Sequence, residues 1–124
     1  MTDATDFADC RNCLCLEARR NAQLLTRAYE RRLRPHGLTI NQFSLLSSLI
    51  LGGPQPLAGL AERLGVERTT LVRNVALAEK EGLVETRPER SGRRQLVDIT
   101  LQGRARAIEA LPAWRAAQTE ARDA

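Results

Sequence analysis

The residues best suited to chemistry lie on one face of a helix predicted over about residues 67–81. They carry short polar or cationic side chains on its first turns, and they are Arg68, Thr69, Thr70, Arg73 and Asn74. Leu71, Val75 and Ala78 recur at helical spacing on the opposite face, as in a helix with one buried side. Hydroxyl, amide and guanidinium groups arranged in this way suit the reading of base edges in a major groove. The polar face therefore predicts contact with double-stranded DNA.

A second group of cationic side chains lies in and beside a turn between two predicted strands, 83–87 and 95–99. The turn, residues 88–94, contains proline, serine and glycine, as hairpin connections do. The arginines in and next to it are Arg87, Arg90, Arg93 and Arg94. Arginine at a hairpin tip can reach the DNA backbone or the adjacent minor groove, where the negative potential attracts it. We therefore expect these residues to add DNA contacts.

The three cysteines, Cys10, Cys13 and Cys15, are clustered near the N-terminus, and three interpretations of them stay open. The cluster could sense oxidants or electrophiles, because a helix capped by Asp9 would favour a Cys10 thiolate in its first turn, with Arg11 adjacent. It could bind zinc or copper(I) if two chains shared a site. Alternatively, the cysteines could pack as small apolar residues at a dimer interface.

Catalysis finds little support in the sequence. His36 is the only histidine, and it follows Pro35 in a predicted turn. No catalytic triad can be assembled around it, and the chain has neither a glycine-rich phosphate loop nor a zinc-protease motif. The Cys-x-x-Cys pair lacks the βαβ pattern of thiol oxidoreductases. We expect no enzyme, no cofactor and no metal site within one chain.

The composition fits one small domain that binds a polyanion. The 124 residues allow one modest core, and 43% hydrophobic with 27% charged residues is usual for a soluble domain. The net charge of +4 favours an anionic partner weakly, but Lys80 is the only lysine among 19 basic residues, and arginine binds phosphate and guanine bidentately. The sequence has no signal-peptide or membrane-span pattern. The expected compartment is the cytoplasm, where cysteines stay reduced.

Two short helices and a hairpin must position the cationic groups. Residues 57–64 give one apolar helical face, Gly65 ends that helix, and Val66 can plug the core before the second helix begins. Gly82 is predicted to end the second helix in the left-handed conformation. A helix-turn-helix followed by a basic hairpin is a winged helix. We therefore expect a mostly helical, α+β fold.

A long helix is predicted before this unit, from Asp9 to about Arg34, with residues 1–8 frayed. Apolar residues around it exceed one stripe, which indicates a partner subunit. The stripe itself is Leu14, Ala18, Ala22, Leu25, Tyr29 and Leu33. Thr39 and Gln42 form a capping box for the next helix, which ends at a Gly-Gly-Pro sequence.

A last helix is predicted after the hairpin, capped by Thr100. Pro112 is expected to kink or interrupt it, and Trp114 is a candidate either for a subunit interface or for its own core. The predicted buried face is Leu101, Ala105, Ile108 and Leu111.

Three segments, in this order, resemble the MarR family of bacterial transcription regulators: LAERLGVERTTLVRNV, EKEGLVETRP and RRQLVDITLQGR. The resemblance implies one MarR-like domain over residues 1–124, with dimerisation helices at 10–34 and 101–124 and a DNA-binding winged helix at 39–100. It also implies an effector pocket between the dimer helices and the DNA-binding lobe. Tyr29 and Phe43 are candidates to line that pocket, although both also fall on apolar stripes and suit the core.

Two positions depart from the family pattern. The wing usually carries Asp-x-Arg, but here these positions are Ser91 and Arg93, so Ser91 or Glu89 must brace the arginine. The recognition helix usually begins with Ser, Thr or Asp, but here with Glu67. A carboxylate still suits a helix N-terminus.

Together these features predict a homodimeric, sequence-specific transcription regulator that binds a pseudo-palindrome in double-stranded DNA. We expect a repressor that responds to oxidants, electrophiles or a small ligand. Its two recognition helices would enter successive major grooves with centres roughly 34 Å apart. The alternative is a winged helix used for protein–protein contact, with its arginine-rich face on an acidic partner. No membrane contact is expected.

Overall fold

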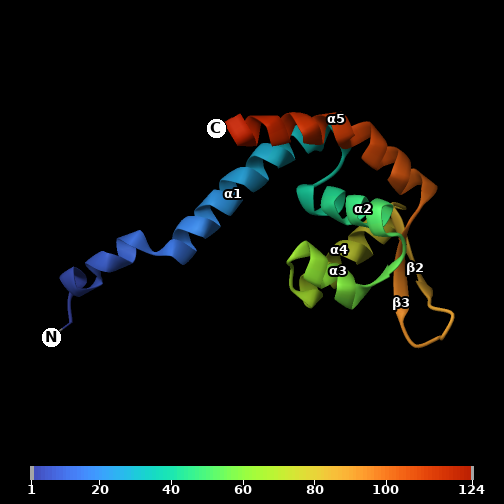
Figure 1. Ribbon diagram of the computed structural model, residues 1–124, viewed down its shortest axis with the longest axis horizontal. Helices are drawn as coiled ribbons and strands as arrows, with labels where there is room; N and C mark the ends of the chain where they lie inside the picture. The colour runs from blue at the N-terminus through green and yellow to red at the C-terminus, as the bar shows by residue number, and fades with distance from the viewer. Residues whose placement is uncertain (1, 124) are drawn as a thin grey trace.

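The computed structural model describes residues 2–123 and consists of two regions (Figure 1). Helices α1 and α5 lie against each other along part of their length, and α2, α3, α4 and a small sheet form a separate lobe. The elements are η1 (3-10 helix) Ala4–Asn12, α1 Leu14–Leu33, η2 (3-10) Arg34–His36, α2 Ile40–Gly52, β1 Gln55–Pro56, α3 Leu57–Leu64, α4 Arg68–Lys80, β2 Val84–Pro88, β3 Gln95–Ile99 and α5 Leu101–Asp123. The predicted mostly helical winged-helix fold is confirmed.

Local sequence signals set most of the helix boundaries. At the start of α2, the Thr39 hydroxyl accepts from the Gln42 amide at 3.1 Å, and the Gln42 side chain accepts from the Thr39 amide at 3.0 Å. Thr100 caps α5, since its hydroxyl oxygen accepts from the Gly103 amide at 2.9 Å. Gly82 ends the α4 region with a φ of 77°, in the left-handed region that glycine adopts most easily. The predicted capping box, Thr100 cap and glycine stop are therefore all confirmed.

The sheet has three antiparallel strands in the order β1-β3-β2. The hairpin pairs Val84 with Ile99 and Pro88 with Gln95, so β2 and β3 are fully in register. Strand β1 was not predicted, because it has only two residues and its second residue is Pro56. The buried Gln55 side chain fixes this strand, since its amide nitrogen donates to the Ser48 carbonyl at 2.9 Å.

One apolar core joins the lobe to the long helices. It includes the predicted inward residues of α3 and α4, and Val66 packs against it from the turn between them. Its fully buried large side chains are Leu33, Leu45, Leu46, Leu49, Leu60, Leu71, Leu83, Val84 and Val97. This core fixes the orientation of α4 relative to the hairpin. No helix in the part of the chain that the structure describes is long and apolar enough to cross a bilayer.

The predicted buried stripe of α1 is only partly confirmed within one chain. Leu33 is fully buried, but Leu14 is 79% exposed and Leu25 is 48% exposed. The reason is visible in Figure 1, where the first half of α1 projects away from the rest of the molecule. The second half packs on α5: the Tyr29 hydroxyl donates to Gln118, and Arg32 pairs with Glu120.

The predicted buried face of α5 is wrong at three of its four residues, since only Leu111 is half-buried and packs against the core. Leu101 is 88% exposed and Ile108 is 62% exposed, and Ala105 is exposed as well. The buried residues of this helix are instead all small: Gly103, Ala107, Ala110 and Ala117. Gly103 lies where α5 passes close to the backbone of Leu83. Pro112 does not interrupt the helix, which continues to Asp123 and bends along its length (Figure 1).

The N-terminal segment also differs from the prediction. Residues 4–12 form a 3-10 helix instead of fraying, although residue 1 lies outside the described part of the chain. Asp9 does not cap the long helix. Asp3 caps η1 by accepting from the Thr5 amide at 2.8 Å, and Cys13 occupies the N-cap position of α1 without a side-chain capping bond.

Candidate nucleic-acid interface

Helices α3 and α4 form the predicted helix-turn-helix. Gly65 takes a φ of 66° between them, and the Val66 amide donates to the Ala61 carbonyl at 3.1 Å. Leu71 and Val75 of α4 are buried against the core. The helix therefore cannot rotate about its own axis without exposing apolar surface, and its opposite face stays directed at solvent.

The predicted DNA-contacting residues of α4 fall into two groups. Arg68, Thr69 and Arg73 are exposed, whereas Thr70 and Asn74 are half-buried. Asn74 borders a small cavity of about 50 Å³ that lies against α2, so it stands at the edge of the solvent-facing side. Glu67 is the N-cap residue, and its side chain makes no capping hydrogen bond. The first amides of α4 thus receive no acceptor from that cap.

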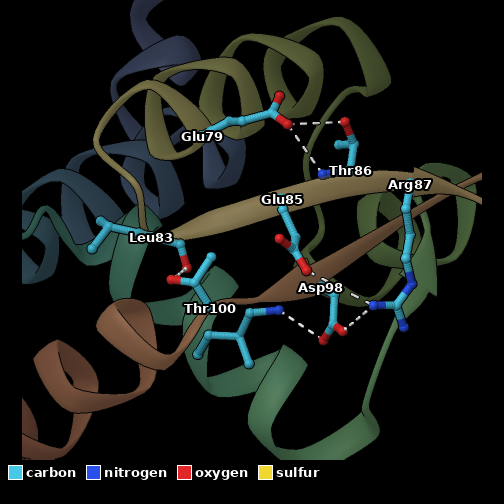
Figure 2. Close-up of polar contacts among 8 residues, drawn as sticks. Glu79, Leu83, Glu85, Thr86, Arg87, Asp98 and Thr100 are labelled. Carbon is cyan, nitrogen blue, oxygen red and sulfur yellow. Dashed lines mark hydrogen bonds and ion pairs between the residues drawn. The ribbon is translucent and has the colours of Figure 1, made fainter.

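A hydrogen bond network links the recognition helix to the wing, as Figure 2 shows. The Glu79 carboxylate of α4 accepts from the backbone amide of Thr86 at 3.1 Å and from its hydroxyl at 3.0 Å. At the base of the hairpin, where β3 leads into α5, the Thr100 amide donates to the Leu83 carbonyl at 3.1 Å. Glu79 therefore ties β2 to α4, and the Thr100–Leu83 bond closes the base of the hairpin at the start of α5. Sequence reasoning missed the role of Glu79.

The base of the wing holds one of the predicted arginines in an ion pair. The Arg87 guanidinium lies 2.9 Å from the Asp98 carboxylate across the strands and 3.8 Å from Glu85 (Figure 2). Asp98 also accepts from the Ile99 amide at 2.8 Å. The charge of Arg87 is thus balanced by acidic neighbours.

The tip of the wing holds a second arginine in place. Nε and Nη2 of Arg94 donate to the two carboxylate oxygens of Glu89 at 2.7 and 2.9 Å, and Ser91 contacts the same carboxylate at 3.4 Å. The hydrogen bonds from Arg94 lower the pKa of the Glu89 carboxyl, and those to Glu89 raise the pKa of Arg94. The pair is therefore charged at neutral pH. Glu89 braces Arg94 instead of the expected Arg93.

Two wing arginines keep their charge available. Among the described residues, Arg90 and Arg93 have no ion-pair partner, and both are exposed. The four predicted wing residues are therefore of two kinds: Arg87 and Arg94 shape the hairpin, and Arg90 and Arg93 can meet a polyanion.

The cysteines are placed differently from the sequence prediction. All three are exposed. Cys10 lies near the end of η1 and not in the first turn of the long helix, whereas Cys15 lies in that turn, 3.9 Å from the Arg19 guanidinium. Across residues 2–123, no three His, Cys, Asp or Glu side chains converge on a point where a metal could bind.

An apolar groove lies between α2 and α5, where an effector pocket was predicted. It has a volume of about 460 Å³ and is lined by Phe43, Ser44, Ser47, Ile50, Leu51, Ala107, Ile108, Leu111 and Trp114. The rings of Phe43 and Trp114 stack with centroids 6.0 Å apart. Phe43 therefore borders the groove, whereas Tyr29 does not and is bonded to Gln118 instead.

A helix-turn-helix with an exposed cationic face, bonded through Glu79 to the β-hairpin that follows it, defines a winged-helix DNA-binding protein. The model of the MarR family matches residues 36–95. The chain belongs to the MarR family of transcriptional regulators. It is therefore a regulator and not an enzyme.

The chain is also similar to solved structures of transcriptional regulators. The M. tuberculosis regulator MosR in complex with DNA is 42% identical over 87% of this chain and 79% of that one, with a TM-score of 0.80. A probable regulator from Pseudomonas aeruginosa is 28% identical over 84% and 78%, with a TM-score of 0.76. A MarR family regulator from Streptomyces coelicolor is 28% identical over 82% and 72%, with a TM-score of 0.73. No curated protein sequence matches the chain.

Proposed function

We propose that this protein is a homodimeric, sequence-specific repressor that binds a pseudo-palindrome in double-stranded DNA. One observation carries the proposal: the exposed cationic face of α4 is fixed to the wing through Glu79 and Thr86, so helix and wing can contact DNA as one unit. The M. tuberculosis regulator MosR, which is 42% identical, has been solved in complex with DNA, and this supports the proposal. Residues 39–100 would form the DNA-binding lobe.

The proposed dimer uses helices 10–34 and 101–124, of which residue 124 lies outside the described part of the chain. The projecting half of α1 supports it, because Leu14, Leu24 and Leu25 are 79%, 63% and 48% exposed there. A helix that projects alone is marginally stable in water and gains its stability from the burial of an apolar face. A second copy of the chain would supply the surface that covers these leucines.

The wing provides the experiment that tests DNA binding. We expect affinity for a duplex selected from a randomised library to fall about 10³–10⁵-fold between 50 and 200 mM salt, if six to ten phosphates are contacted. Arg93→Ala should lower the affinity and reduce the salt slope by about 1 per subunit, with little change in the selected sequence, because Arg93 has a free charge at the wing. Fluorescence anisotropy measures both quantities.

A double variant, Glu89→Gln with Arg94→Gln, is the matched control. It removes a cation and an anion together, so its salt slope should equal that of the parent. If the double variant loses as much slope as Arg93→Ala, Arg94 is the phosphate contact and the assignment of the two arginines is reversed. If no sequence is enriched from the library at low salt, the protein–protein alternative replaces DNA binding.

We propose oxidation of the cysteine cluster as the signal that releases DNA. The Cys13 amide donates to the Cys10 carbonyl at 3.3 Å, and a turn closed in this way brings its end Cα atoms within about 7 Å. Disulfides need roughly 4.4–6.8 Å between Cα atoms, so this pair is close enough with little movement. Peroxide would convert one thiolate to a sulfenic acid with loss of hydroxide. The second thiol would then form the disulfide with loss of water.

Mild peroxide is therefore expected to lower the DNA affinity of the parent, and dithiothreitol should restore it. The variant Cys10→Ser with Cys13→Ser should keep its affinity after the same treatment, whereas Cys15→Ser should respond as the parent does. Anisotropy measures binding, and mass spectrometry measures the loss of two hydrogens per disulfide. Full affinity in a parent whose thiols are oxidised would leave packing as the better account of the cysteines.

A further inference from the structure

The 3-10 helix η1 presents two different edges to solvent. A 3-10 helix has three residues per turn, so side chains three apart lie above one another. Phe7 and Cys10 fall on one edge, whereas Asp6 and Asp9 fall on another, in line with the capping residue Asp3. No residue of η1 is buried, and the large Phe7 ring is 59% exposed. This segment therefore combines an unpartnered apolar edge with an acidic one.

The groove between α2 and α5 has the complementary character. Phe43 and Trp114 stack against each other in its lining, and Leu51 and Ile108 border it with 87% and 62% of their surface exposed. Large apolar side chains left open around a cavity of about 460 Å³ are typical of a site that receives another apolar group.

Charge also matches between the two surfaces. Arg104 lies one helical turn before Ile108 on α5, and Arg115 lies one turn after Leu111, so a cation flanks each end of the groove. Both arginines are exposed, and neither forms an ion pair within residues 2–123. The aspartates of η1 could pair with them while its apolar edge enters the groove.

The η1 segment of one chain, called the arm below, cannot reach the groove of the same chain without breaking α1. That helix has 20 residues and is therefore roughly 30 Å long, and it carries η1 away from the lobe (Figure 1). A second copy is the occupant with the required sequence. An arm exchanged in this way would also cover apolar surface that each chain leaves exposed.

We propose that η1 of each subunit docks in the α2–α5 groove of its partner, with Phe7 as the apolar anchor. The inference rests on the proposed homodimer and adds a defined contact to it. Cys10 lies on the same edge as Phe7, so a disulfide from Cys10 to Cys13 alters the docking edge itself. Because α2 belongs to the DNA-binding lobe, the thiols of one chain then act on the recognition helix of the other.

Disulfide cross-linking tests the contact in the full-length dimer. One chain keeps Phe7 and Cys10 and has Cys13 and Cys15 changed to Ser. The other chain, of different length, carries Ile108→Cys with Cys10, Cys13 and Cys15 changed to Ser, and the mixed dimer is oxidised with copper phenanthroline. The expected product is a covalent dimer of one long and one short chain, several-fold more abundant than with Leu77→Cys in place of Ile108→Cys. Leu77 is a matched control, because its side chain is 55% exposed, similar to the 62% of Ile108. It lies on α4, which contributes no residue to the groove.

The outcomes separate this inference from the proposed function. Equal yields for Ile108→Cys and Leu77→Cys, in chains that are dimeric by light scattering and bind the selected DNA, overturn the docking while the regulator stands. A monomer that still binds DNA overturns the docking together with the dimer.

Trp114 gives a second readout, because it is the only tryptophan of the chain and lines the groove. Phe7→Ala should increase acrylamide quenching of its fluorescence and shift its emission to the red, and Phe7→Leu should largely restore the parent values. Identical quenching in the parent and in Phe7→Ala overturns the docking and leaves the groove open for a small apolar ligand.

Discussion

Replacing Gly103 by alanine is expected to lower the free energy of unfolding by about 3 kcal/mol, the upper part of the usual range for overpacking a core. A Cβ atom built on Gly103 would lie 2.0 Å from the Leu83 carbonyl oxygen and 3.1 Å from Cγ1 of Ile99. The first contact is with backbone, so no rotamer change can relieve it. The first turn of α5 would have to move away from the chain that leaves α4.

That movement would also break the polar contacts at this junction. The Thr100 amide donates to the Leu83 carbonyl at 3.1 Å, and the Thr100 hydroxyl donates to the Gly82 carbonyl at 2.6 Å. Urea denaturation at one fixed protein concentration measures the loss, because a dimer gains stability with concentration. Binding of DNA by the folded fraction should weaken as well, since β2 and the wing follow Leu83.

Gly59→Ala is the matched control for this change. Gly59 lies inside α3, and a Cβ added there would meet no atom within 4 Å. The alanine should therefore stabilise the protein by roughly 0.5–1 kcal/mol through its higher helix propensity. Equal denaturation midpoints for the two variants would mean that α5 does not approach Leu83 as closely as described.

Close approach of this kind explains where sequence reasoning failed for α5. The prediction chose Leu101 and Ile108 because large apolar side chains usually mark the buried face. The true face is a row of small residues, Gly103, Ala107 and Ala110, spaced by four and three. Small side chains let a helix lie directly on other backbone, and ranking residues by hydrophobicity gives them little weight. Only the spacing of glycine and alanine carried the signal.

The elements that were predicted well have signals that act within a few residues. The capping box of Thr39 with Gln42 and the left-handed Gly82 need no knowledge of the tertiary fold. The same is true of the helical spacing of Leu71, Val75 and Ala78 on α4. By contrast, the long helix begins at Leu14, although Asp9 looked like its cap, because Asp3 starts a separate 3-10 helix first.

For the candidate site, the sequence located the arginines but could not tell which of them keep a free charge. Glu89 and Arg94 face each other because the hairpin register pairs Pro88 with Gln95. Glu89 is the residue after Pro88 and Arg94 is the residue before Gln95, so they are the next opposing positions toward the tip. Asp98 reaches Arg87 across neighbouring strands for the same reason. The register of the hairpin determines both ion pairs. An error of one residue in the predicted strand ends changes the register and so pairs different residues.

The second large effect is expected at the recognition helix, where Arg73→Ala should weaken binding to the selected duplex by about 1–3 kcal/mol, or roughly 5–150-fold. Arg73 lies on the exposed side of α4, between Leu71 and Val75, which are buried and fix the orientation of the helix. Its guanidinium can therefore be held toward a major groove without a change in the fold. A bidentate contact to guanine is the interaction that such a position favours.

A change of net charge alone would also weaken DNA binding, so the comparison needs a variant that removes the same charge elsewhere. Arg122→Ala does this in the last turn of α5, outside the helix-turn-helix and the wing. It should cost little, whereas Arg73→Ala should also relax the preference at one position of each half-site in a repeated library selection. A uniform loss of affinity with unchanged preference would make Arg73 a phosphate contact. A folded Arg73→Ala dimer with the affinity of Arg122→Ala would show that α4 is not the reading helix.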